Sequence, residues 1–233
     1  MQRILAAITV AVTLVESSAS AFDPEDLKKL RDNIVRPSKK DQCINCDLSK
    51  TPLANHGLEK FDLSGANLSK AILTNTNLWG AILRKANLHG ADLSNVNLFD
   101  ADLSGANLSG ATLVAANISL ANLRIANLNT ANLSLADLTY ANLTNANLSD
   151  ADLSKAGLSE AKLYDANLSS AHLSETNLTQ AIFTNAKLYK ADLMKANLSG
   201  ANLKGADLSY ALLQGAILCN TTMPDGSVIY SGC

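Results

Sequence analysis

The sequence predicts an all-β solenoid, a chain wound into stacked coils instead of packed as a globule. Three observations support this fold class. Between residues 63 and 218, leucine or a close substitute recurs at every fifth position without a gap. Alanine stands two positions before most of these leucines. Aromatic residues make up only 4% of the chain, so its core must consist of small and aliphatic side chains.

Two positions of the repeat are strict enough to be buried. With the central leucine as position i, there are 32 repeats, and position i is Leu in 30 of them, Ile118 and Phe183 being the exceptions. Position i−2 is Ala in 28 repeats. The exceptions at i−2 are Phe61, Thr76, Val96 and Thr176. Such regular apolar positions predict one continuous core.

A period of five fits neither a continuous helix nor a continuous strand. Five helical residues turn about 500°, which would leave successive leucines about 140° apart around the helix. In a strand, an odd period would move each leucine to the opposite face. The chain must therefore bend once per repeat. Positions i−2 and i then face inward, and the bend falls at i+1 and i+2. Gly, Asn, Asp and Lys are frequent at i+2, which suits a bend.

The length of one coil follows from position i−1. Asn occupies 11 of the 16 positions that run in tens from 67 to 217, but only 4 of the 16 in the interleaved series. This alternation requires an even number of repeats in each coil. Two-sided coils would leave little room for leucine, so four sides and 20 residues per coil are predicted. Each coil would pair its backbone with the coils before and after it.

The pattern A-[DN]-L-x-x, seen twice in ADLSGANLSG at residues 101–110, resembles the pentapeptide-repeat family. The resemblance covers residues 61–218 strictly. It implies a right-handed, four-sided β-helix with Leu and Ala inside. Upstream, residues 43–60 are predicted to form a degenerate first coil, because three leucines continue the register there: Leu48, Leu53 and Leu58.

Residues 1–21 resemble a signal peptide. Arg3 precedes an apolar stretch at residues 4–15, and Ala19-Ser20-Ala21 fits a cleavage site. The apolar stretch is too short to cross a bilayer, which takes about 20 residues, so no membrane span is expected in the mature chain. The protein is predicted to be exported, to a periplasm or otherwise secreted. The family resemblance adds the thylakoid lumen of a cyanobacterium as a destination.

Both ends of the repeat region are predicted to carry caps, because a solenoid otherwise exposes open edges. Residues 22–42 are predicted to form a helix, with Asp23 as N-cap and Pro24 at its first position. Its apolar stripe consists of Leu27, Leu30 and Ile34. Residues 219–233 are predicted to form the C-terminal cap, with a turn at Pro224-Asp225-Gly226.

The four cysteines are predicted to form two disulfides. Stacked strands are about 4.8 Å apart, which places Cys46 and Cys219 roughly 40 Å from each other. A disulfide requires Cα atoms within about 7 Å. Only Cys43 with Cys46 and Cys219 with Cys233 can therefore coexist. For the C-x-x-C pair, redox activity, metal binding and free thiols stay open as alternatives to a structural disulfide.

Composition and motifs indicate a protein without catalytic function. The three histidines are dispersed, and no cofactor or metal site is predicted. The net charge of −2 provides no basic face for nucleic acid. The leading hypothesis is a non-catalytic, exported structural or protein-interaction scaffold. One alternative is a thiol–disulfide oxidoreductase that uses Cys43 and Cys46. The family resemblance suggests another, a DNA mimic that inhibits a topoisomerase, but residues 61–218 contain 12 acids and 10 bases, too few net charges for mimicry.

Departures from the repeat mark the candidate partner surface. Trp79 and Phe99 are 20 residues apart and are predicted to stack in one column at position i+1. Four further apolar residues occupy bends around the fourth strict coil and are predicted to point from different corners: Leu120, Ile125, Leu135 and Tyr140. The expected partner is an unidentified protein or a second copy in a homodimer.

Overall fold

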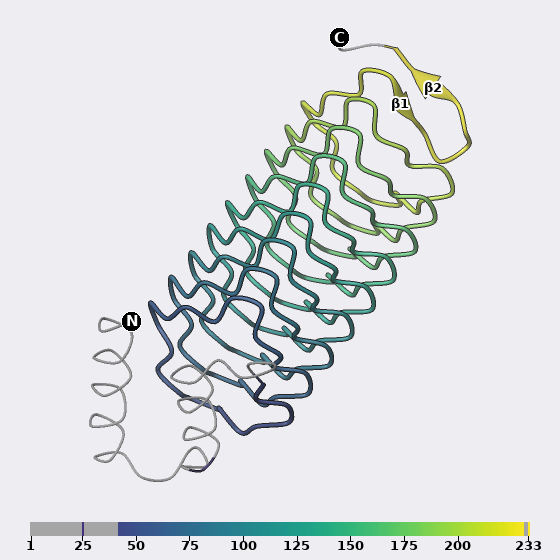
Figure 1. The fold of residues 1–233 in the computed structure, drawn as a ribbon. Helices are drawn as coiled ribbons and strands as arrows, with labels where there is room; N and C mark the ends of the chain where they lie inside the picture. The colour runs from purple at the N-terminus through teal and green to yellow at the C-terminus, as the bar shows by residue number, and fades with distance from the viewer. Residues whose placement is uncertain (1–24, 26–41, 231–232) are drawn as a thin grey trace.

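The computed structural model describes residues 25, 42–230 and 233, which wind into a rod of stacked coils (Figure 1). The predicted signal peptide at residues 1–21 lies outside the described residues. The predicted helical cap at residues 22–42 also lies outside them, apart from Glu25 and Gln42.

Parallel bridges define the period of the rod. Every isolated bridge joins residues 20 apart, from Gln42 with Asp62 to Asn202 with Thr222. The bridging residue is position i−1 of each repeat, and a two-residue turn follows at i+1 and i+2. One coil therefore contains four pentapeptides and four turns. The predicted all-β solenoid and its 20-residue period are confirmed.

Backbone hydrogen bonds connect each coil to the next. At position i, the Leu128 N–H donates to the Asn147 carbonyl oxygen of the following coil at 2.7 Å. At position i+2, the Thr130 N–H donates to the Ser149 carbonyl oxygen at 3.0 Å. Each turn is closed within its own coil, as where the Ala131 N–H donates to the Leu128 carbonyl oxygen at 3.0 Å. The repeat thus pairs its polar backbone while the chain keeps bending.

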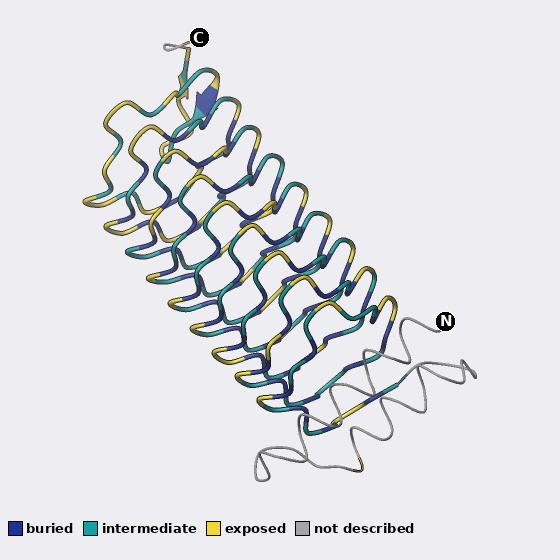
Figure 2. Ribbon diagram, turned by 90° about the vertical axis from the view of Figure 1, so that its left-hand side faces the viewer, coloured by how far each residue is buried: buried dark blue, intermediate teal, exposed yellow. Residues whose placement is uncertain are grey.

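The core is a continuous stack of Leu and Ala side chains along the rod. Figure 2 shows the buried residues, in dark blue, recurring in every coil. The aromatic Phe183 fits the leucine position and is fully buried. Thr76 and Thr176 at the alanine position are also buried, and the hydroxyl of each donates to a carbonyl of the preceding coil. Thr76 contacts the Leu53 oxygen at 2.6 Å, and Thr176 contacts the Leu153 oxygen at 3.0 Å. The predicted inward positions are confirmed.

The bends explain the residues found at position i+2. Each such residue from Asn45 to Asn220 has a positive φ, between 54° and 72°. This left-handed region is readily adopted by Gly and tolerated by Asn and Asp, but is unfavourable for bulky side chains. Glycine therefore recurs at bends, as at Gly105 with φ 66°.

The C-terminal end carries a small antiparallel hairpin. Strand β1 (Thr221–Thr222) pairs with β2 (Val228–Ile229), and Thr222 also bridges to Asn202 of the preceding coil. The Gly226 N–H donates to the Met223 carbonyl oxygen at 2.9 Å, so the predicted turn is confirmed. The hairpin lies at the end of the rod (Figure 1). Core leucines near this end are only partly buried: Leu208, Leu213 and Leu218.

Candidate interaction surface

Within residues 42–230 and at 25 and 233, no three His, Cys, Asp or Glu side chains gather to hold a metal ion. In this same portion, no helix is long and apolar enough to cross a membrane. The candidate functional features are the disulfides and the outer faces of the rod.

The first disulfide joins Cys43 to Cys46 across a bend, with Cα atoms 5.3 Å apart. Cys43 occupies position i, and Cys46 occupies the inward alanine position of the next repeat. Their exposed fractions are 1% and 2%. Thiol–disulfide exchange needs a sulfur atom that another thiolate can reach. The burial of both sulfurs suits a structural cross-link.

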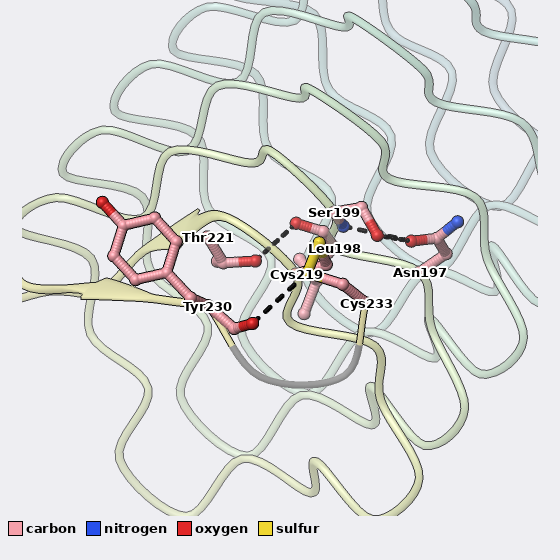
Figure 3. The surroundings of a disulfide bond; sticks show 7 residues. All are labelled: Asn197, Leu198, Ser199, Cys219, Thr221, Tyr230 and Cys233. Carbon is pink, nitrogen blue, oxygen red and sulfur yellow. Dashed lines mark hydrogen bonds between the residues drawn. A yellow bond between two sulfur atoms is a disulfide. The ribbon is translucent and has the colours of Figure 1, made fainter.

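The second disulfide joins Cys219 to Cys233, with Cα atoms 4.8 Å apart. Figure 3 shows that it brings the end of the chain back to the last coil, beside Leu198. The Thr221 hydroxyl donates to the Leu198 carbonyl oxygen at 2.7 Å, and Cys233 Sγ lies 3.3 Å from the Tyr230 carbonyl oxygen. The hairpin is thus attached to the rod at both of its ends.

Asn and Asp at position i−1 serve the rod itself. On one face, each Asn side chain donates its Nδ2 to an Oδ1 of the preceding coil, at 3.0 to 3.3 Å. The same Oδ1 atoms accept the backbone N–H two residues later, as from Ser109 to Asn107 at 3.2 Å. This ladder comprises Asp47, Asn67, Asn87, Asn107, Asn127, Asn147 and Asn167. These side chains stabilise turns and coil contacts.

Asp102 takes part in an ion pair between adjacent coils. Arg84 Nε lies 2.5 Å from Asp102 Oδ2. Partial burial alone would raise the pKa of Asp102, but hydrogen bonds from Arg84 and Ser104 outweigh this effect, so its pKa is lowered. Asp102 is therefore a charged, structural residue, unlike a proton-transferring acid, whose pKa would be raised toward neutrality.

Four of the six candidate surface residues share one edge of the rod. We call the two turn residues of a repeat a corner. Equivalent positions of one corner are 20 residues apart in successive coils. We call four apolar residues at one corner the apolar ridge: Trp79 and Phe99 at position i+1, and Leu120 and Tyr140 at position i+2. Trp79, Leu120 and Tyr140 are 39%, 48% and 51% exposed, and Phe99 is partly exposed. The ridge is a strip of apolar side chains on the surface of the rod.

Backbone contacts connect this corner from coil to coil. The Gly80 N–H donates to the Phe99 carbonyl oxygen at 2.9 Å, and the Leu120 N–H donates to the Thr139 carbonyl oxygen at 3.0 Å. Between them, Asp100 and Ser119 are joined in the same way at 3.0 Å. The ridge therefore crosses four adjacent coils without interruption.

The prediction that Leu120 and Tyr140 point from different corners is wrong. They differ by 20 residues, which is one coil, so they occupy the same corner. Ile125 and Leu135 do lie elsewhere, at the two corners that flank the ridge, and are 66% and 57% exposed. The structure thus brings Leu120 and Tyr140 together with Trp79 and Phe99, and leaves Ile125 and Leu135 apart.

At each end of the ridge, a charged side chain contacts the aromatic residue. Lys60 Nζ lies 4.5 Å from the centroid of the Trp79 ring, a cation–π contact. At the other end, the Tyr140 hydroxyl donates to Glu160 Oε1 at 2.8 Å. This hydrogen bond and the negative charge of Glu160 raise the pKa of Tyr140. Lys60 and Glu160 were not predicted from the sequence, although their numbers place them in the same 20-residue column.

Trp79 and Phe99 form the predicted column, but their rings do not stack on each other. For the described residues, the recorded ring–ring contact joins Tyr189 and Tyr210, with centroids 5.6 Å apart, and Trp79 instead contacts Lys60. Trp79 and Phe99 still lie on adjacent coils at one corner.

Comparison with known proteins identifies the repeat. The sequence profile of the family described as pentapeptide repeats matches in eight copies. The matches cover residues 62–98, 91–129, 131–169, 161–200 and 201–225. None of the curated protein sequences compared with the chain matches it significantly.

Several solved structures resemble the chain. HetL, a pentapeptide-repeat protein involved in heterocyst differentiation regulation in the cyanobacterium Nostoc sp. strain PCC 7120, is 32% identical, with a TM-score of 0.54. The alignment covers 86% of this chain and 98% of HetL. A pentapeptide-repeat protein of the Arabidopsis thaliana thylakoid lumen is 34% identical, over 47% of this chain and 69% of its own, with a TM-score of 0.26. Rfr23 from the cyanobacterium Cyanothece 51142 is 36% identical, over 45% and 58%, with a TM-score of 0.21.

Proposed function

Because the chain belongs to the pentapeptide-repeat family, we propose that it is a non-catalytic, exported scaffold that binds another protein chain through its apolar ridge. The observation that carries this proposal is the gathering of Trp79, Phe99, Leu120 and Tyr140 at one corner of four adjacent coils. Contiguous exposed apolar surface on a soluble protein typically marks an interaction site.

The conformation of the ridge supports the proposal. Leu120 and Tyr140 have φ values of 60° and 61°. A non-glycine residue pays on the order of 1 kcal/mol in this region. Their side chains remain about half exposed. Contact with a partner would bury the remaining apolar area.

Two observations support export. Residues 1–21 have the composition of a signal peptide. All four cysteines are paired, as is usual in oxidising compartments. We infer a periplasm, a cyanobacterial thylakoid lumen or the extracellular space as the destination.

The proposal also covers the winding of the rod and the boundaries of its segments. Family membership supports a right-handed, four-sided winding. We infer a helical N-terminal cap at residues 22–42, a degenerate first coil at 43–60, the repeat domain at 61–218 and the C-terminal cap at 219–233. Proteolysis from each end, followed by mass spectrometry, tests these boundaries. Early cleavage inside residues 61–218 would contradict them.

Neither alternative function gains support. A thiol–disulfide oxidoreductase needs an accessible sulfur, whereas Cys43 and Cys46 are buried. A DNA mimic needs a strongly anionic surface, and the chain has a net charge of only −2.

Affinity capture from the native exported fraction tests the proposal. The wild type is compared with a Trp79→Ser, Phe99→Ser variant. The matched control is Tyr189→Ser, Tyr210→Ser, which removes an aromatic pair at another corner. We expect bound protein to be lost with the ridge variant and kept with the control. Equal retention by all three proteins would exclude the ridge as the binding site.

A further inference from the structure

We propose that the apolar ridge binds the ridge of a second copy of this chain, in an antiparallel, two-fold symmetric dimer. The inference rests on the proposed function, for which it names the partner. It is supported by the order of residues along the ridge, by the charges at its ends and on its flank, and by the contrast with a polar corner of the rod.

The order along the ridge is self-complementary. From coil to coil the ridge reads Trp79, Phe99, Leu120 and Tyr140. A two-fold axis between the second and third coils places Phe99 opposite Leu120 of the second copy. It places Trp79 opposite Tyr140 of the second copy. Each contact occurs twice, as an isologous interface requires, and each pairs an aromatic side chain with an apolar or aromatic one.

The charges at the ends select the antiparallel orientation. Lys60 and Glu160 are 100 residues apart, which is five coils or about 24 Å along the rod. The two-fold places Lys60 against Glu160 of the second copy at both ends. A parallel pair would place like charges together. Both groups are already oriented, Lys60 by the Trp79 ring and Glu160 by the Tyr140 hydroxyl. Complementary charges of this kind set the register of an interface.

The column of residues beside the ridge also carries opposite charges five coils apart. A continuous series of bridges places Asp62 and Lys162 in one column, again five coils apart and again opposite in charge. The same two-fold brings Asp62 to Lys162 of the second copy. On the other flank, Asn77 comes opposite Asp137 of the second copy. The Glu59 carboxylate is turned toward this flank, where it accepts from Asn77 Nδ2 at 2.6 Å.

Asp100 is the group that opposes association. It shares a corner with Phe99, and the two-fold brings its copies within about one coil spacing along the axis. Asp100→Asn keeps a residue that tolerates the positive φ of 57° and removes this repulsion. We expect Asp100→Asn to tighten the dimer.

Another corner of the rod provides a matched contrast, which we call the polar corner. Lys50 and Asp150 also stand at position i+2, five coils apart, with φ values of 57°. The i+1 residues between them are polar: Ser69, His89, Ser109 and Asn129. The polar corner thus has the end charges of the ridge without its apolar centre, and we expect no self-association there.

Charge reversal tests the dimer directly. Sedimentation equilibrium over a range of concentrations measures its Kd for the full mature chain with both disulfides formed. Lys60→Glu and Glu160→Lys should each raise the Kd about tenfold, because each substitution enters the interface twice. The double variant Lys60→Glu, Glu160→Lys should restore the wild-type Kd. The same exchange at the polar corner, Lys50→Glu with Asp150→Lys, should leave the Kd unchanged.

Leu120→Asn tests the apolar part of the interface. Asn suits the positive φ at this position, so the variant should fold, which its Tm verifies. It should weaken the dimer, whereas the matched variant Leu135→Asn at a flanking corner should not.

A wild-type chain that sediments as one copy at every concentration would overturn the proposal. So would a double charge reversal that fails to restore the Kd. The proposed function stays separately testable in both cases, because ridge-dependent capture of a different protein would uphold the scaffold and assign the ridge to that partner. A dimer restored by the double reversal, without any captured protein, would uphold the self-association.

Discussion

Leu128 shows how a single residue supports the rod. Its side chain is fully buried in the leucine stack, and its N–H donates to the Asn147 carbonyl oxygen of the next coil. The neighbouring Asn127 points outward and exchanges side-chain hydrogen bonds with Asn107 and Asn147 at 3.3 and 3.2 Å. Adjacent residues of one repeat thus serve the core and the surface separately.

We expect Leu128→Asp to cost more than about 4 kcal/mol, because it removes a buried leucine and places a carboxylate in the core. Asn127→Ser should cost about 1 kcal/mol, since it loses partly exposed hydrogen bonds and serine can still accept from the Asn129 N–H. Chemical denaturation of both variants measures the difference. Equal losses of stability would contradict the inward assignment of position i.

The C-terminal cap is the element whose stability depends most on a covalent bond. The hairpin of β1 and β2 has only two residues per strand, too few to be stable alone. The Cys219–Cys233 disulfide closes a segment with a sequence separation of 14. A loop of this size stabilises by about 3 kcal/mol in the chain-entropy account.

Removing the bridge by Cys233→Ser should therefore free the cap while the rod persists, because coils contact only their neighbours. Hydrogen exchange is expected to accelerate at Thr222 and Ile229 and to stay slow at Leu128. A Cys43→Ser, Cys46→Ser variant serves as control and should leave the cap protected. Accelerated exchange throughout the rod in Cys233→Ser would show that the cap and the coils unfold together.

Across the whole molecule, the same side-chain hydrogen bonds repeat from coil to coil, so their small contributions to stability add up. Several aspartates at position i−1 or in the cap turn accept hydrogen bonds from a serine two residues later. These bonds lower the pKa of Asp207 and Asp225. Asp102 follows the same rule through Arg84 and Ser104, against the opposing effect of its partial burial.

Acid should destabilise the rod. A carboxylate whose pKa is lower in the folded chain than its unfolded value of about 3.9 adds stability above that value. The contribution is lost as the pH falls through the folded pKa. We expect a lower Tm at about pH 3 than at pH 7, and a smaller decrease for Asp102→Asn, whose amide oxygen can still accept from Asn122. An equal decrease in this variant would assign the acid sensitivity to other groups.

Much of the architecture could be read from the five-residue period. The inward positions i−2 and i, the bend at i+2, the 20-residue coil and the turn before Ser227 follow from local rules about polarity and backbone conformation. The Cys219–Cys233 partnership also follows, because the rod length forbids other pairings. The β1–β2 hairpin does not, since its two short strands lack any periodic signal.

The candidate surface was predicted only in part. Trp79 and Phe99 were recognised as one column, but Leu120 and Tyr140 were assigned to different corners. Steps of 20 join Trp79 with Phe99 and Leu120 with Tyr140, and the two pairs share a corner because positions i+1 and i+2 form one turn. Lys60 and Glu160 also lie in the 20-residue column of Leu120 and Tyr140, but the sequence does not show which neighbour each of them contacts, because long side chains can reach several neighbours at a corner.

The five-residue pattern alone specifies the coil, because a strict period of apolar residues leaves a chain few ways to bury them. Which surface residues meet depends on how the coils stack. Residues 20 apart become neighbours through the stacking of coils, and a surface exists only once that stacking is known. The apolar ridge, with Lys60 and Glu160 at its ends, is therefore a property of the folded rod, although every residue in it belongs to an ordinary repeat.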